Sequence, residues 1–180
     1  AYAVNNWLAF ELTQDNKYRF LGNESYFQFA PEHENRFSQD PYAKKHMTAM
    51  RESYARARAY YEANGRLASY SLYGDGTALE TAYLDSLGGE IWYGNWTGHP
   101  PPPAAFVIED EAGTYEKGGL TYRCDSSTLL NDGIRITHND NPFFFVAAVA
   151  GYNWCATGAD SILLFYEPKS RLALFTFDWT

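Results

Sequence analysis

Apolar residues between Asp40 and Gly65 recur at steps of three and four, and this spacing predicts one long helix over residues 41–63. Asp40 suits the N-cap because its carboxylate accepts backbone N–H groups, and Pro41 suits the first helical position, where its missing donor costs no hydrogen bond. Asn64 and Gly65 readily take the left-handed conformation that ends many helices. The recurrence gives one apolar stripe, which we expect to pack on a sheet. The stripe contains Ala43, Met47, Met50, Tyr54, Ala57 and Tyr61.

Most of the remaining chain alternates between apolar and polar residues, which is the pattern of half-buried strands. Turn-forming residues separate the alternating segments, for example at residues 14–16 and 167–170. We predict strands at residues 4–12, 18–29, 67–73, 90–96, 105–109, 120–124, 133–138, 143–149, 162–166 and 172–179. Residues 77–87 are predicted as a short second helix, because their apolar side chains fall on one side of a helix.

These elements predict an α+β fold: a strongly curved antiparallel sheet or β-barrel with the long helix packed against it. A cone-shaped arrangement of helix and sheet is the alternative. A length of 180 residues fits a single β-rich domain of residues 1–180. The four prolines at 100–103 predict an exposed polyproline II segment, which is either a spacer or a ligand for a proline-binding groove.

Composition and charge exclude several classes of protein. A hydrophobic content of 46% and an aromatic content of 18% argue against disorder. The net charge of −8 argues against nucleic acid as a partner, because binding to phosphates relies on Lys and Arg. The longest apolar run, residues 142–150, is shorter than the roughly 20 residues that a membrane-spanning helix requires. We therefore expect an acidic protein without a membrane span.

Two cysteines and two glycosylation sequons favour a secreted protein. The sequons begin at Asn23 and Asn95, and each predicts a glycan on an exposed turn. An even cysteine count in that compartment predicts a disulfide between Cys124 and Cys155. Loop entropy would make this bond worth about 3–4 kcal/mol. In a cytosolic protein the same cysteines would be two buried thiols.

Aromatic residues are the main lead to a binding function. Several come from segments that a curved sheet would bring together, and a cavity lined by rings with few charges is typical of a small-molecule site. The predicted ligand-binding residues are Trp92, Trp96, Tyr122, Phe145, Tyr152 and Trp154. The expected partner is a small apolar or aromatic molecule, and the alternative is that these rings only fill a core. The sequence does not identify a cofactor.

Motifs of common enzymes are absent from the sequence, including phosphate-binding loops and the Gly-x-Ser-x-Gly elbow. His138 is the best candidate for acid–base chemistry, with Asp140 or the carboxylates at 109–111 to orient its ring. Its alternative role is that of a solvated turn histidine. Acidic clusters at 32–34 and 109–111 are interpreted as solvated loops, so no metal site is predicted.

The long helix also carries basic residues, of which Lys44, Arg51 and Arg58 share one face. Lys45 and Arg56 add to the positive charge, so this surface is either solvated or a docking site for an acidic protein partner. The sequence thus favours a secreted module that binds a small molecule. An isomerase, cyclase or hydrolase that uses His138 is the first alternative, and a secreted effector or inhibitor that acts through a protein surface is the second.

Overall fold

The computed structural model describes residues 2–4, 6–27, 39–69, 79–89, 91, 96, 103–110, 113–117, 120–124 and 134–179. Side chains are described in these ranges except at position 4 and at positions 109–124. By their contacts the residues divide into two compact units. The first unit comprises residues 1–23, 86–147 and 163–180, and the second comprises residues 24–85 and 148–162. The expectation of one domain stays a prediction.

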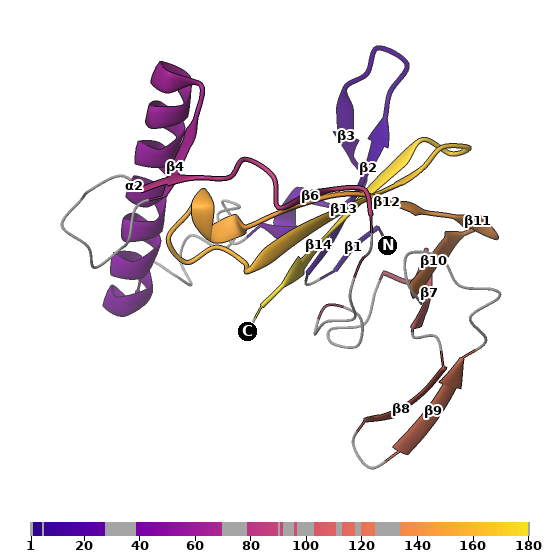
Figure 1. Ribbon diagram of the computed structural model, residues 1–180. Helices are drawn as coiled ribbons and strands as arrows, with labels where there is room; N and C mark the ends of the chain where they lie inside the picture. The colour runs from indigo at the N-terminus through magenta and orange to yellow at the C-terminus, as the bar shows by residue number, and fades with distance from the viewer. Residues whose placement is uncertain are drawn as a thin grey trace. The chain divides into compact units, whose positions relative to one another are not determined.

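The fold is α+β, with one long helix, a large antiparallel sheet and several small sheets. The strand order in the large sheet is β1-β2-β14-β13-β12-β6, and β3 also pairs with β2 (Figure 1). Its strands are β1 (Ala3–Val4), β2 (Trp7–Leu12), β3 (Tyr18–Phe20), β6 (Ser86–Leu87), β12 (Phe144–Val149), β13 (Ser161–Glu167) and β14 (Leu172–Asp178). No pairing between the two edges closes this sheet within the described ranges, so the structure shows neither a barrel nor a strong curl.

Alternation along the central strands builds the core of the first unit. In β2 the side chains of Trp7 and Ala9 are fully buried, and opposite them in β14 lie the buried Thr176 and Leu174. Successive side chains of a strand point to opposite faces, so these four share one face of the sheet. Leu163 and Phe165 add to the buried residues of β13.

The small sheets are formed from neighbouring strands. The first unit contains β7 (Val107–Asp110), β10 (Ile134–His138) and β11 (Asn141–Pro142) in one sheet, and β8 (Gly113–Lys117) with β9 (Leu120–Cys124) in another. The second unit contains the pair β4 (Leu67–Ser69) and β5 (Leu79–Thr81). It also contains two short 3-10 helices, η1 (Glu24–Tyr26) and η4 (Gly151–Asn153).

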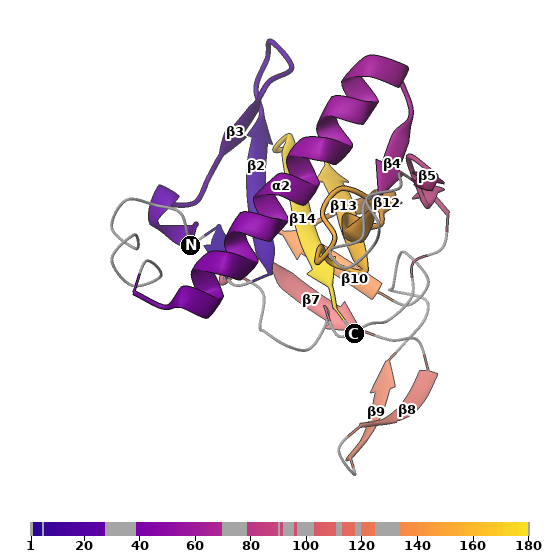
Figure 2. The ribbon, with the colours of Figure 1, turned by 90° about the vertical axis from the view of Figure 1, so that its left-hand side faces the viewer.

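The long helix, α2 (Pro41–Asn64), begins and ends as predicted. The Asp40 carboxylate accepts the N–H groups of Tyr42 and Ala43, and Gly65 follows the helix with a φ of 64°. The chain then turns into β4, which runs beside the helix in both ribbon views (Figures 1 and 2). Within the described ranges, no helix combines the length and apolarity needed to cross a membrane.

The buried face of α2 differs from the predicted stripe. Ser53 and Ala57 are buried, whereas Tyr54, expected in the stripe, is 45% exposed. The buried part of α2 is therefore centred on the small side chains of Ser53 and Ala57, while Met47 and Met50 of the predicted stripe are half-buried. Arg51 and Arg58 are exposed, as predicted.

The prediction of a second helix over 77–87 is wrong. Its described part forms β5 and β6, and β5 pairs antiparallel with β4. Leu79, placed on the supposed apolar face of that helix, is 69% exposed. A short helical period in the sequence was thus overridden by strand pairing, which satisfies backbone groups that an isolated short helix leaves open. The strand β8 was not predicted.

Candidate functional site

Two of the predicted ligand-binding aromatics belong to a packed core. Trp96 is only 1% exposed, and its ring lies 6.0 Å from that of Trp7 and 5.7 Å from that of Phe165, measured between centroids. The ring of Phe145 lies 5.7 Å from the same Phe165. These separations are those of aromatic rings in direct contact. In the first unit, therefore, the rings of Trp96 and Phe145 contact other core rings.

The other predicted aromatics have different positions. Trp154, in the second unit, lies 5.9 Å from Tyr61 and 6.2 Å from Tyr83 between ring centroids. Tyr152 is about half exposed. Trp92 lies outside the described residues, and Tyr122 is described by its backbone alone, in β9. Among the predicted residues, Trp154 is thus the one whose described contacts lead to a pocket.

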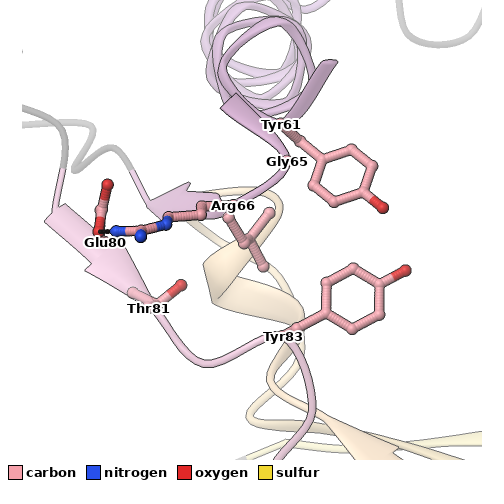
Figure 3. A pocket seen from close by; sticks show the side chains of 7 residues that line it. Tyr61, Gly65, Arg66, Glu80, Thr81 and Tyr83 are labelled. Carbon is pink, nitrogen blue, oxygen red and sulfur yellow. Dashed lines mark hydrogen bonds and ion pairs between the residues drawn. The ribbon is translucent and has the colours of Figure 1, made fainter. Parts of the chain in front are cut away.

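A pocket of about 400 Å³ lies at the end of α2, where the chain enters β4 and meets β5. We call it the Tyr61–Tyr83 pocket. It is lined by Tyr61, Gly65, Arg66, Leu67, Glu80, Thr81 and Tyr83 (Figure 3). All seven residues belong to the second unit, and the volume falls in the lower part of the range typical of small-molecule sites.

Local structure explains how these residues meet. The N–H of Gly65 donates to the carbonyl of Tyr61, and the left-handed conformation of Gly65 ends the helix and redirects the chain. In the β4–β5 ladder Leu67 lies opposite Thr81, so the two side chains share one face. The helix end and the strand register therefore fix the floor of the pocket.

One wall of the pocket is aromatic. The rings of Tyr61 and Tyr83 are nearly parallel, with 5.7 Å between centroids and 27° between planes. The side-chain hydrogen bond with Tyr61 and the charge of that neighbouring group raise the pKa of Tyr83 above its ordinary value. Trp154 contacts both rings. Tyr83 thus stays neutral at neutral pH.

The loop that carries Trp154 is tightly packed. The N–H of Ala156 donates to the Ser53 hydroxyl at 3.0 Å, which joins the loop to the buried face of α2. A side-chain carbon on Gly158 would lie 2.4 Å from the backbone of Gly151. Glycine is therefore required where these two backbone segments approach each other.

The opposite wall is polar, as Figure 3 shows. Arg66 Nη1 lies 3.1 Å from Glu80 Oε2, and the Tyr60 hydroxyl donates to Glu80 Oε1 at 2.8 Å. The hydrogen bond from Tyr60 and then that from Arg66 hold the pKa of Glu80 below its ordinary value. The wall therefore presents a guanidinium group and the carboxylate of Glu80, which is ionised at neutral pH.

Between the two walls lies the hydroxyl of Thr81. Its Oγ1 is buried and has no hydrogen-bond partner among the described residues. Figure 3 shows this oxygen directed toward the middle of the pocket. A buried hydroxyl without a partner costs free energy, so the interior of the second unit carries one unmet hydrogen-bonding group at Thr81.

The predicted catalytic residues His138 and Asp140 lie at a hairpin turn between β10 and β11. Asn139 and Asp140 have φ angles of 49° and 61° and connect β10 to β11 as a two-residue hairpin turn of the I′ type. Asp140 is exposed in that turn. His138 contacts the rings of Tyr2 and Phe106, and its described electrostatic partner is Glu167, which the sequence did not single out.

Metal-ligating groups were not expected. In the described part of the chain, no cluster of three or more His, Cys, Asp or Glu side chains is placed to hold a metal ion. The acidic cluster at 32–34 lies outside the described residues, and the side chains at 109–111 are not described either.

The predicted covalent features concern four residues. The Sγ of Cys155 lies 3.6 Å from the carbonyl oxygen of Met50. The side chain of Cys124 is not described, so the Cys124–Cys155 disulfide stays a prediction. Asn23 is exposed, as a glycan acceptor must be, and Asn95 lies outside the described residues.

The chain matches no protein-family model, no curated protein and no solved structure.

Proposed function

We propose that this protein binds a small aromatic molecule in the Tyr61–Tyr83 pocket. The observation that carries the proposal is a cavity of about 400 Å³ with an aromatic wall and an ion pair opposite it. Few polar groups in a mainly apolar cavity are what orient a small ligand. The proposal does not depend on a curved sheet or barrel, which the sequence favoured.

The ligand lies beside the tyrosine pair and not between its rings. A third ring between Tyr61 and Tyr83 needs two stacking distances of at least about 3.5 Å each. The centroid separation of 5.7 Å is too small for that. A planar ligand therefore lies over Leu67 and Thr81, with its face or edge against the tyrosines.

Ligand-observed NMR with p-cresol and indole as probes tests this proposal. Saturation of the protein should transfer to both probes, and Tyr83→Ala should weaken the transfer strongly because it removes half of the aromatic wall. Tyr83 is 52% exposed, so its removal leaves the core intact. Tyr42→Ala is the matched control, since Tyr42 is an exposed tyrosine of α2 that does not line the pocket. The proposal would be overturned if neither probe received saturation, or if the transfer were equal in wild type and Tyr83→Ala.

A second candidate function is the docking of an acidic protein on α2. Lys44 and Lys45 are exposed, and the helix contains five basic residues against two acidic ones in a chain of net charge −8. A fluorescent peptide of ten glutamates tests it by anisotropy. Lys44→Gln with Lys45→Gln should weaken binding several-fold more than Lys17→Gln, an exposed lysine of the β2–β3 loop. Equal effects would exclude a specific site on the helix.

Secretion is part of the proposal, and it is supported by the exposed sequon at Asn23. Expression in a glycosylating host followed by peptide mapping should find a glycan there. Thiol titration of the denatured, unreduced protein should find no free cysteine if Cys124 and Cys155 are bonded. Two reactive thiols would show that the predicted disulfide is wrong.

A further inference from the structure

We propose that the ligand of the Tyr61–Tyr83 pocket is an aromatic zwitterion of the size of an aromatic α-amino acid. This inference rests on the proposed function and adds the charge of the ligand. The aromatic ring lies against Tyr61 and Tyr83. The carboxylate of the ligand faces Arg66, and its ammonium group faces Glu80.

The two charged side chains retain capacity for further hydrogen bonds. A guanidinium group has five N–H donors, and the bond from Arg66 to Glu80 uses one of them. The Glu80 carboxylate accepts one bond on each oxygen, from Tyr60 and Arg66, out of about four lone-pair sites. Both groups are also partly exposed, with side-chain exposures of 72% for Arg66 and 49% for Glu80. A ligand is therefore able to reach each of them without breaking the pair.

The spacing of the pair disfavours a ligand with only one sign of charge. The Arg66 guanidinium and the Glu80 carboxylate are only 3.1 Å apart. An anion that is attracted to Arg66 is therefore repelled by Glu80, and a cation that is attracted to Glu80 is repelled by Arg66. The bond from Tyr60 helps to keep Glu80 ionised, so this compensation persists at neutral pH. A zwitterion whose carboxylate and ammonium group are bonded to one carbon atom interacts with both side chains at once, because its two charges are about as close together as those of Arg66 and Glu80.

The remaining pocket residues suit such a molecule. Leu67 is almost fully buried and gives an apolar floor beneath the ring. Gly65 adds no side chain to the pocket lining at the helix end.

Calorimetric titration with four related probes tests the inference. L-phenylalanine carries both charges, phenethylamine lacks the carboxylate, 3-phenylpropionate lacks the ammonium group, and 2-phenylethanol lacks both. We expect L-phenylalanine to bind about fivefold more tightly than each of the others, which is the size of effect that partly exposed ion pairs produce. Arg66→Gln should abolish the preference over phenethylamine, and Glu80→Gln should abolish the preference over 3-phenylpropionate.

The exposed Arg58–Glu62 pair on α2 supplies matched controls. Arg58→Gln and Glu62→Gln remove the same charges outside the pocket and should leave every preference unchanged. If 2-phenylethanol binds as tightly as L-phenylalanine, the zwitterion inference is wrong while the binding function stands. If none of the four probes binds, and p-cresol and indole do not bind either, both proposals fail.

Discussion

Arg171 donates a hydrogen bond from Nε to the backbone carbonyl of Leu12 at 2.7 Å, although the two residues are 159 positions apart in the chain. Its Nη2 donates to the carbonyl of Thr13 at 2.8 Å. Arg171 follows the β13–β14 turn, and Leu12 ends β2, so one guanidinium joins two hairpins of the large sheet. Arg171 also has a φ of 55°, which is uncommon for a residue with a side chain.

Replacement of Arg171 should therefore destabilise the large sheet. Arg171→Ala removes two charge-assisted hydrogen bonds from partly buried carbonyls and should lower the free energy of unfolding by about 2–3 kcal/mol. Arg171→Gly loses the same bonds but tolerates the positive φ, so it should be about 1 kcal/mol more stable than Arg171→Ala. Urea denaturation of both variants measures the two effects. Equal stability of wild type and Arg171→Ala would show that this contact contributes nothing.

Glu167 should make stability depend on pH. Its side chain is fully buried, and its oxygens accept the N–H groups of Lys169 at 2.6 Å and Ser170 at 2.8 Å. Burial alone would raise the pKa of Glu167, but the hydrogen bonds from Ser170 and Lys169 outweigh it, helped by nearby His138, and hold the pKa below its ordinary value. Glu167→Gln should lower the free energy of unfolding by about 1–3 kcal/mol at pH 7.

The pH dependence follows from the direction of that shift. The carboxylate of Glu167 stabilises the fold fully above its unfolded-state pKa, about 4.3, and this contribution is lost as the pH falls through the lower folded-state pKa. The difference between wild type and Glu167→Gln should therefore be constant from pH 7 to pH 5 and shrink below about pH 4. Urea unfolding midpoints of wild type and Glu167→Gln across this pH range measure the difference. A difference that stays undiminished at pH 3 would contradict the assigned role.

The helix and the principal strands were predictable because local chemistry determines them. Asp40, Pro41 and Gly65 mark the ends of α2 whatever surrounds it, and β13 and β14 carry long apolar runs joined by a turn. The sheet order was not predictable, because β2 pairs with β14 across most of the chain. The burial of Ser53 was missed for a similar reason, since its partner Ala156 comes from a distant loop.

The candidate site was only partly accessible from sequence. Tyr61 stood in the predicted stripe and Trp154 among the predicted ligand-binding residues, but nothing in the sequence joined them. Glu80 and Thr81 were missed because residues 77–87 were predicted as a helix, whereas residues 79–81 form β5. The order apolar, acidic, β-branched at residues 79–81 was the available signal, since alternation of that kind indicates a strand. His138 was predicted to pair with Asp140 or the carboxylates at 109–111, whereas the fold brings Glu167 near it.

Two glycine substitutions should separate a steric clash from backbone strain. In Gly158→Ala the new carbon meets the backbone of Gly151 at 2.4 Å, which should cost about 2–3 kcal/mol and displace the loop that carries Trp154. In Gly65→Ala no atom lies within 4 Å of the new carbon, so only the φ of 64° is unfavourable and the cost should be about 1 kcal/mol. Thermal or urea unfolding ranks the variants. If Gly65→Ala lowered the stability more than Gly158→Ala, the tight packing of the loop that carries Trp154 and Gly158 would be refuted.

The central claim is that the Tyr61–Tyr83 pocket holds the ligand, and chemical-shift mapping tests it most directly. Protein labelled with ¹⁵N is titrated with p-cresol while backbone amide signals are followed. We expect the largest shifts at the amides of the pocket, including Arg66, Leu67 and Thr81, with those of Lys44 and Lys45 at the other end of α2 unchanged. Saturable shifts confined to residues outside the pocket, or no shifts at all, would contradict the claim.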